Sequence, residues 1–233
     1  MNVINRMIIS KKEERKMRNE QIEKLKEYKK MLYVVDMVNG FVNEGVLHDK
    51  HIGKTIPEQI KLIEKMKEEK EGISFIKDCH QKDSIEFKTF PEHCLKGTSE
   101  SLLVKELQPY EKDALVYEKN STSAMFAPHM LEDLNLLENL EEVIGVGCCT
   151  DICDLNFFIP LKNYFNQLNR DVTIFAVKNA MDTYHIEKIH DREEYTNMSY
   201  KLMEQAGIIL VEDIEELKEK EQIMGITKKR RKG

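Results

Sequence analysis

A thiol follows an apolar run in the segment GVGCCTDIC at 145–153. The pattern predicts a strand that ends in small residues and a helix that Cys153 opens. Unpaired N–H groups and the positive end of the helix dipole stabilise a thiolate and a developing oxyanion, which suits acyl transfer. Cys153 is therefore the candidate nucleophile. The alternative is a small, inert, buried cysteine.

Two other polar side chains follow apolar runs in the same way. Asp36 comes after the run at 31–35, and Lys119 comes after the run at 114–117. A cysteine hydrolase needs a group that accepts the thiol proton and a cation that holds charge nearby, and Asp36 and Lys119 supply both. Taken alone, Asp36 could cap a helix or begin a turn, and Lys119 could be a solvated side chain.

A second group of residues has the chemistry of a metal site. Asp78 and His80 are two positions apart, so both point to one face of an extended segment, and His93 follows. One carboxylate and two imidazoles suit a divalent transition metal with positions open for water and substrate. The alternative is a structural zinc site that includes Cys79 and Cys94, although Cys79 would point to the opposite strand face.

The elements that position these groups alternate between strand and helix patterns. Short apolar runs typical of buried strands occur at 31–36, 73–76, 114–117, 143–146, 172–177 and 208–211. Helix patterns occur at 57–70 and at about 130–139, 151–169, 191–206 and 212–222. We expect an α/β fold with a six-stranded, mostly parallel sheet flanked by helices.

The order of these elements places the reactive residues together. In a parallel sheet the ligand crevice lies beyond the carboxyl ends of the strands. Asp36, Asp78, Lys119 and Cys153 each follow a predicted strand, so we expect them to meet at one edge.

The composition limits the class of protein. The 233 residues can bury one sizeable core, and we expect a single catalytic domain at 31–222. A net charge of -6 argues against a general nucleic-acid binder, so the expected partner is a small molecule. Five cysteines, an odd number, do not form a disulfide framework and favour a reducing cytoplasm. Neither a membrane span nor a signal peptide is apparent, so no membrane partner is expected.

Charged segments flank the predicted domain. Residues 1–30 are expected to be a helical extension, because 11–30 is dense in Lys, Glu, Arg and Gln and lacks Pro and Gly. Residues 223–233 end in the basic run KKRRKG and are expected to be a disordered tail. The alternative for this tail is contact with a nucleic acid or an anionic surface.

Three ordered segments resemble the signatures of the isochorismatase-like cysteine hydrolases, a superfamily that includes the nicotinamidases. They are VVDMVNGF at 34–41, EKNSTSAMF at 118–126 and GCCTDIC at 147–153, and the resemblance covers about 31–211. It implies a Rossmann-like sheet that carries an Asp36-Lys119-Cys153 triad. It also implies a cis peptide at Cys148-Cys149 and an oxyanion hole formed by the N–H groups of Cys149 and Cys153.

The segment FPEHCLKGT at 90–98 is similar to the metal-site segment of the nicotinamidase branch. This resemblance implies that Asp78, His80 and His93 bind a divalent ion such as Zn, Fe or Mn. Glu86 is the candidate fourth ligand, because members of the branch place an acidic residue or a His in this interval. Asp83 competes with Glu86 for that role.

The same resemblance implies a substrate pocket lined by Phe41, Phe90 and Phe126, for which the alternative is core packing. Two positions depart from the family pattern: Phe90 replaces a Trp common in some members, and Asp154 replaces a small apolar residue. Three histidines match no motif and are expected at the surface or in loops: His129, His185 and His190.

Together these features predict a metal-dependent cysteine amidohydrolase that converts nicotinamide and water to nicotinate and ammonia through a Cys153 thioester. An isochorismatase or another small-amide hydrolase of the superfamily is the alternative within the enzyme class. A catalytically silent binding module is the alternative outside it. The family habit also favours a homo-oligomer.

Overall fold

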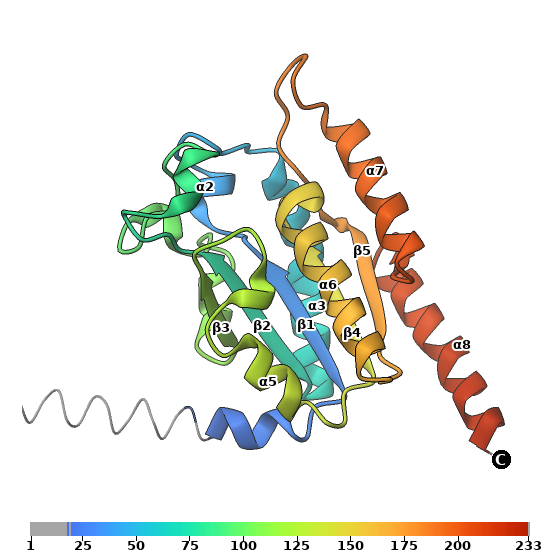
Figure 1. Cartoon of the computed structure of the whole chain (residues 1–233). Coiled ribbons are helices and arrows are strands. Elements are labelled where there is room, and N and C mark those ends of the chain that lie inside the picture. Colours follow the sequence, from blue (N-terminus) through green and yellow to red (C-terminus); the bar gives the residue numbers. More distant parts are fainter. Residues whose placement is uncertain (1–17, 19, 233) are drawn as a thin grey trace, which may run out of the picture.

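A six-stranded parallel sheet forms the centre of the molecule (Figure 1). The computed structural model describes residue 18 and residues 20–232. The strand order is β3-β2-β1-β4-β5-β6, and every ladder in the sheet is parallel, so the expected fold class is confirmed. The strands are β1 (Lys30–Val35), β2 (Gly72–Asp78), β3 (Leu115–Lys119), β4 (Glu142–Gly147), β5 (Thr173–Met181) and β6 (Ile209–Val211).

Helices cover both faces of the sheet. α3 (Ile56–Glu69) and α8 (Ile214–Lys232) pack on one face, and α5 (Met130–Leu136), α6 (Leu155–Gln167) and α7 (Arg192–Gln205) pack on the other. The central strands β1 and β4 are buried almost throughout, as their continuous apolar runs require. Short helices interrupt the connections: α2 (Asn39–Val42), α4 (Gln108–Glu111), and the single turns Ile52–Thr55, Ile85–Lys88, Ser99–Ser101 and Ala124–Phe126.

Helix α3 illustrates how the sequence sets the ends of an element. Pro57 lies in its first turn, where the missing N–H costs nothing, and Leu62, Ile63 and Met66 form its buried face. The helix ends at Lys70, which adopts a left-handed conformation with φ 59°.

A glycine at the end of β4 allows the two central strands to meet closely at the site edge. Gly147 has φ +138°, and a Cβ atom there would lie 2.2 Å from the carbonyl oxygen of Val35 in β1. That neighbour is backbone, which cannot rotate away, so only glycine fits. Gly147 is therefore required by the packing of β4 against β1.

The structure describes parts of both flanking segments. Helix α8 runs on through residues 223–232, the range for which the sequence analysis expects a disordered tail. Of the expected extension at 1–30, residues 20–25 are helical, and 1–17 and 19 lie outside the described residues.

The helix expected at 151–169 also differs, because it begins as a π-helical turn (Thr150–Asp154) that leads into α6. None of the helices within the described residues is both long and apolar enough to cross a membrane.

Candidate active site

Three reactive side chains meet at the carboxyl edge of the sheet, as their places after strands predict. Asp36 follows β1, Lys119 ends β3, and Cys153 lies in the π-helical turn after β4. The ammonium nitrogen of Lys119 lies 2.8 Å from Asp36 Oδ2 and 3.7 Å from Cys153 Sγ. All three side chains are buried. The arrangement brings together an acid, an amine and a thiol, which is the set that cysteine-dependent acyl transfer needs.

Burial controls the protonation of the acid and the thiol. It raises the pKa of Asp36, and because the negative charge of Asp78 adds to this effect against the opposing charge of Lys119, the pKa reaches about 6. Burial also raises the pKa of the Cys153 thiol well above its usual value, although Lys119 opposes this shift. The resting pair is therefore a thiol beside a carboxylate, whereas the position at a helix start predicted a thiolate.

The turn before the thiol has the backbone form that the resemblance implied. The Cys148-Cys149 peptide bond is cis. The Cys148 N–H donates to the carbonyl of Val35 at 3.0 Å, and its thiol donates to the carbonyl of Asp36 at 3.2 Å. These two bonds hold the turn against the end of β1, beside the acid.

The predicted metal ligands Asp78, His80 and His93 form a compact buried group. One ligand atom from each lies within 4.8 Å of the others. Oδ2 of Asp78 is 2.9 Å from His80 Nε2 and 3.0 Å from His93 Nε2. The second oxygen of Asp78 accepts a hydrogen bond from Lys119 at 2.7 Å. Asp78 thus connects this group to the Asp36-Lys119-Cys153 cluster.

The donor set fits a divalent transition metal. It consists of two imidazole nitrogens and one carboxylate oxygen, which zinc, iron and manganese accept. The other ring nitrogen of His93 donates to the Pro91 carbonyl at 2.7 Å, which orients the ring so that Nε2 faces Asp78. Burial raises the pKa of Asp78, but Lys119 and the two histidines outweigh it and hold the pKa below its usual value.

The other candidate ligands lie outside this three-residue group. Glu86 comes nearest, with Oε1 3.9 Å from His80 Nε2, while its other oxygen accepts the Thr122 N–H at 2.9 Å. Asp83 is exposed. Within the described residues the metal-type group contains neither Cys79 nor Cys94, so the alternative of a structural zinc site is wrong.

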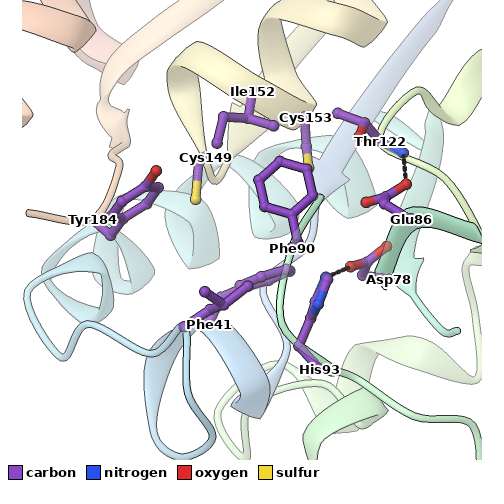
Figure 2. Close-up of a pocket in the computed structure, with 11 residues that line it drawn as sticks. Phe41, Asp78, Glu86, Phe90, His93, Thr122, Cys149, Ile152, Cys153 and Tyr184 are labelled. Atoms are coloured by element: carbon purple, nitrogen blue, oxygen red, sulfur yellow. Dashed lines mark hydrogen bonds and ion pairs between the residues drawn. The ribbon is translucent and has the colours of Figure 1, made fainter. Parts of the chain in front are cut away.

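A pocket lined largely by apolar side chains opens beside Cys153. Figure 2 shows Phe41 and Phe90 within it, with Asp78, Glu86 and His93 on one side and Cys149 and Tyr184 on the other. Leu47, Thr122 and Ile152 complete the lining.

The expected pocket role of Phe126 is wrong. Its side chain is 77% exposed and does not line the cavity. It ends the turn Ala124–Phe126, in which the two preceding side chains face the core and Phe126 faces outward. The family motif located the segment that contains Phe126, but it did not predict which way the side chain points.

A family model described as the isochorismatase domain matches residues 30–213, most of the chain. The chain belongs to the isochorismatase family. Among curated relatives of this isochorismatase-family hydrolase, Nicotinamidase 1 of Arabidopsis thaliana is 29% identical over 140 residues. That match covers 54% of this chain and 57% of the relative, so the chain spans little more than half the relative's length.

Solved structures share the fold of this family member. The nicotinamidase from Bacillus subtilis aligns with a TM-score of 0.65 and 24% identity, covering 79% of this chain and 99% of that one. The pyrazinamidase of Pyrococcus horikoshii, solved in complex with zinc, aligns with a TM-score of 0.63 and 22% identity over 79% and 99% of the two chains.

Some residues around the site carry no signal in the sequence. Tyr184 and Leu47 come from loops without a family motif or a hydrophobic period. His190 lies in a loop, as expected, but it is only 5% exposed and contacts Asp151 in the π-helical turn. His129 and His185 are exposed, as expected.

Proposed function

We propose that this isochorismatase-family hydrolase is a metal-dependent nicotinamidase, which converts nicotinamide and water to nicotinate and ammonia. The observation that carries the proposal is the opening of Cys153 onto an aromatic pocket whose far side holds Asp78 and His93. A planar ring fits between aromatic side chains. The names of the relatives, nicotinamidases and a pyrazinamidase, support the same substrate class.

The charge of the pocket favours a neutral amide over an anionic substrate. Among the described residues that line it, Asp78 and Glu86 are acidic, and none is Lys or Arg. Lys119 is buried and already paired with Asp36 and Asp78. A substrate with carboxylates, such as isochorismate, would meet the negative charges of Asp78 and Glu86 without a Lys or Arg side chain of the described lining to offset its own, which is costly in a partly desolvated site.

The first half of the reaction forms a thioester. The Asp36 carboxylate accepts the proton of the Cys153 thiol while the sulfur attacks the amide carbon. The carbonyl oxygen takes up the displaced electron pair, and the N–H groups of Cys149 and Cys153 would stabilise this oxyanion. Lys119 offsets the charge of the Asp36 carboxylate before the proton moves and the negative charge that develops on the sulfur as it loses that proton.

The second half releases both products. The tetrahedral adduct collapses, the C–N bond breaks, and Asp36 returns its proton to the departing ammonia. A water molecule then attacks the thioester carbon while Asp36 accepts one of its protons. The C–S bond breaks, nicotinate leaves, and the proton returns from Asp36 to the Cys153 sulfur.

Asp78, His80 and His93 would hold the metal ion. When bound, a divalent ion supplies a Lewis acid that attracts the lone pair of a heteroaromatic ring nitrogen or of water. Asp78 belongs to both the metal-type group and the reactive cluster, because one of its oxygens contacts the histidines and the other accepts a hydrogen bond from Lys119.

Ammonia release from a panel of carboxamides, measured with and without added Zn, Fe or Mn, tests this proposal. We expect nicotinamide to be hydrolysed, a chelator to reduce the rate, and restored metal to recover it. An isochorismate control should give no product. Hydrolysis of isochorismate with no ammonia from any carboxamide would contradict the proposal.

A further inference from the structure

A π-helical turn, Thr150–Asp154, carries the proposed nucleophile along one wall of the pocket. Cys149, Ile152 and Cys153 all line the pocket there (Figure 2). The Cys149 carbonyl accepts two hydrogen bonds from the turn, from the Ile152 N–H at 3.0 Å and from the Asp154 N–H at 3.2 Å. Single π-helical turns are rare and occur frequently at functional sites. A shift of this turn would move both the sulfur and the N–H groups proposed to bind the oxyanion, so the contacts that hold the turn from outside matter for the reaction.

Asp151 fastens this turn to the loop between β5 and α7. Its side chain is nearly buried. Its Oδ1 accepts the Thr183 hydroxyl at 2.5 Å, and its Oδ2 lies 2.9 Å from His190 Nε2. A backbone bond runs beside these contacts, because the Thr150 N–H donates to the Asp182 carbonyl at 3.0 Å. The loop therefore holds the turn at its first residues, through one backbone bond and both oxygens of one carboxyl group.

The bond between His190 and Asp151 contains a shared proton. Nδ1 of His190 lies 2.9 Å from the Tyr184 carbonyl, which can only accept, so Nδ1 carries a hydrogen. Nε2 then meets the Asp151 carboxyl group through one further proton, and such charge-assisted bonds are roughly twice as strong as neutral ones. The rings of Tyr184 and Tyr195 stack on the imidazole, each with its centroid 3.9 Å away. His190 is thus held in the orientation that bonds to Asp151.

We propose that His190 is a positioning residue: through Asp151 it holds the π-helical turn, and with it the oxyanion-binding N–H groups, in place for the reaction. This inference rests on the proposed function. His190 does not itself line the pocket, so it acts on the substrate only through the turn. The oxyanion develops only as the sulfur attacks. Loosening the turn therefore slows acyl transfer more than it weakens substrate binding.

The test replaces His190 in the metal-loaded, full-length protein with two side chains that each keep one of its donors. The amide nitrogen of Gln reaches the place of Nε2 and can bond to Asp151, whereas that of Asn reaches the place of Nδ1 and can bond to the Tyr184 carbonyl. We expect His190→Ala and His190→Asn to lower kcat for nicotinamide by about 10–100-fold with KM nearly unchanged, because a displacement of ~1 Å costs this much. His190→Gln should recover most of kcat.

Two further variants show whether His190 acts through Asp151. Asp151→Ala should lower kcat at least as far as His190→Ala. The double variant should be no slower than Asp151→Ala alone, because both substitutions remove the same contact. His185→Ala changes an exposed histidine of the same loop and should keep the wild-type kcat and KM. Thermal melts check folding, and the comparison of the Gln and Asn variants decides the question if His190→Ala does not fold.

Three results in a folded, active enzyme would overturn the inference alone: equal kcat in the Gln and Asn variants, additive losses in the double variant, or a raised KM at unchanged kcat. A merely structural role of His190 would give the first of these. If another carboxamide is hydrolysed in place of nicotinamide, the same ratios are measured with that amide. Hydrolysis of no carboxamide would overturn the proposed function and this inference together.

Discussion

Acidification is expected to switch off the enzyme by protonating Asp36. Burial beside Asp78 raises the pKa of this carboxyl from 3.8 to about 6, and the facing charge of Lys119 limits the shift. The shift corresponds to about 3 kcal/mol at ~1.4 kcal/mol per pKa unit. Because the base must be ionised to accept the thiol proton, kcat/KM should fall about tenfold per pH unit below pH 6.

The assay is the pH profile of kcat/KM for nicotinamide between pH 4.5 and about pH 8, with ionic strength constant. Metal content is measured at each pH, because protonation of the histidines would also release metal. Asp36→Asn should lower kcat/KM by about 10²–10⁴-fold and abolish the acid limb near pH 6. A wild-type profile that stays flat down to pH 5, or that rises only with thiol ionisation above pH 8.5, would refute the reasoning.

The same shift predicts an opposite effect on folding. A carboxyl whose pKa is higher in the folded state favours folding at low pH, so its contribution is lost as pH rises from 3.8 through about 6. Keeping Asp36 ionised at neutral pH therefore lowers the free energy of unfolding. Urea unfolding of the wild type and of Asp36→Asn at pH 4 and pH 7 measures this contribution.

Other substitutions test separate parts of the account. Cys153→Ala should abolish ammonia release while the circular dichroism spectrum is retained; residual activity at the wild-type level would contradict the nucleophile assignment. His80→Ala should weaken metal binding, measured by competition with a chromogenic chelator, by more than the ~10–100-fold typical when a residue that only hydrogen-bonds to a ligand is lost. Asp154 has two buried oxygens with no hydrogen-bond partner among the described residues, and burial raises its pKa well above normal, so its contribution to folding is lost as pH rises above 3.8. Asp154→Asn should therefore increase the free energy of unfolding at pH 8 by about 1–3 kcal/mol and by less at pH 4; an equal change at both pH values would contradict this. Gly147→Ala should destabilise the fold by about 3 kcal/mol or more in urea unfolding, because its Cβ meets the Val35 backbone; a neutral effect would refute that packing argument.

The sequence could predict the sheet and the meeting of its reactive residues. Runs such as 143–146 are buried on both faces, so they are apolar at nearly every position however the helices pack on them. Parallel strands also end at a common edge of the sheet. Asp36, Lys119 and Cys153 each follow such a run. Asp78 and His80 share a side because side chains alternate along an extended chain.

The remaining features depend on contacts between loops, which local pattern does not encode. The outward turn of Phe126 and the burial of His190 follow from how their segments pack, not from their neighbours in sequence. The protonation of Cys153 shows the same limit. A helix start favours a thiolate, but the surrounding structure removes water and adds the charge of Asp36, and these effects raise the pKa.

Covalent capture of Cys153 during turnover is the most direct test of the central claim. Metal-loaded enzyme is mixed with nicotinamide, quenched in acid on the time scale of a single turnover, digested and analysed by mass spectrometry. The account predicts a nicotinoyl thioester on the peptide that contains Cys153, located on that sulfur by fragmentation. Turnover with unmodified Cys153 at every quench time, or an adduct on Cys149 instead, would contradict it.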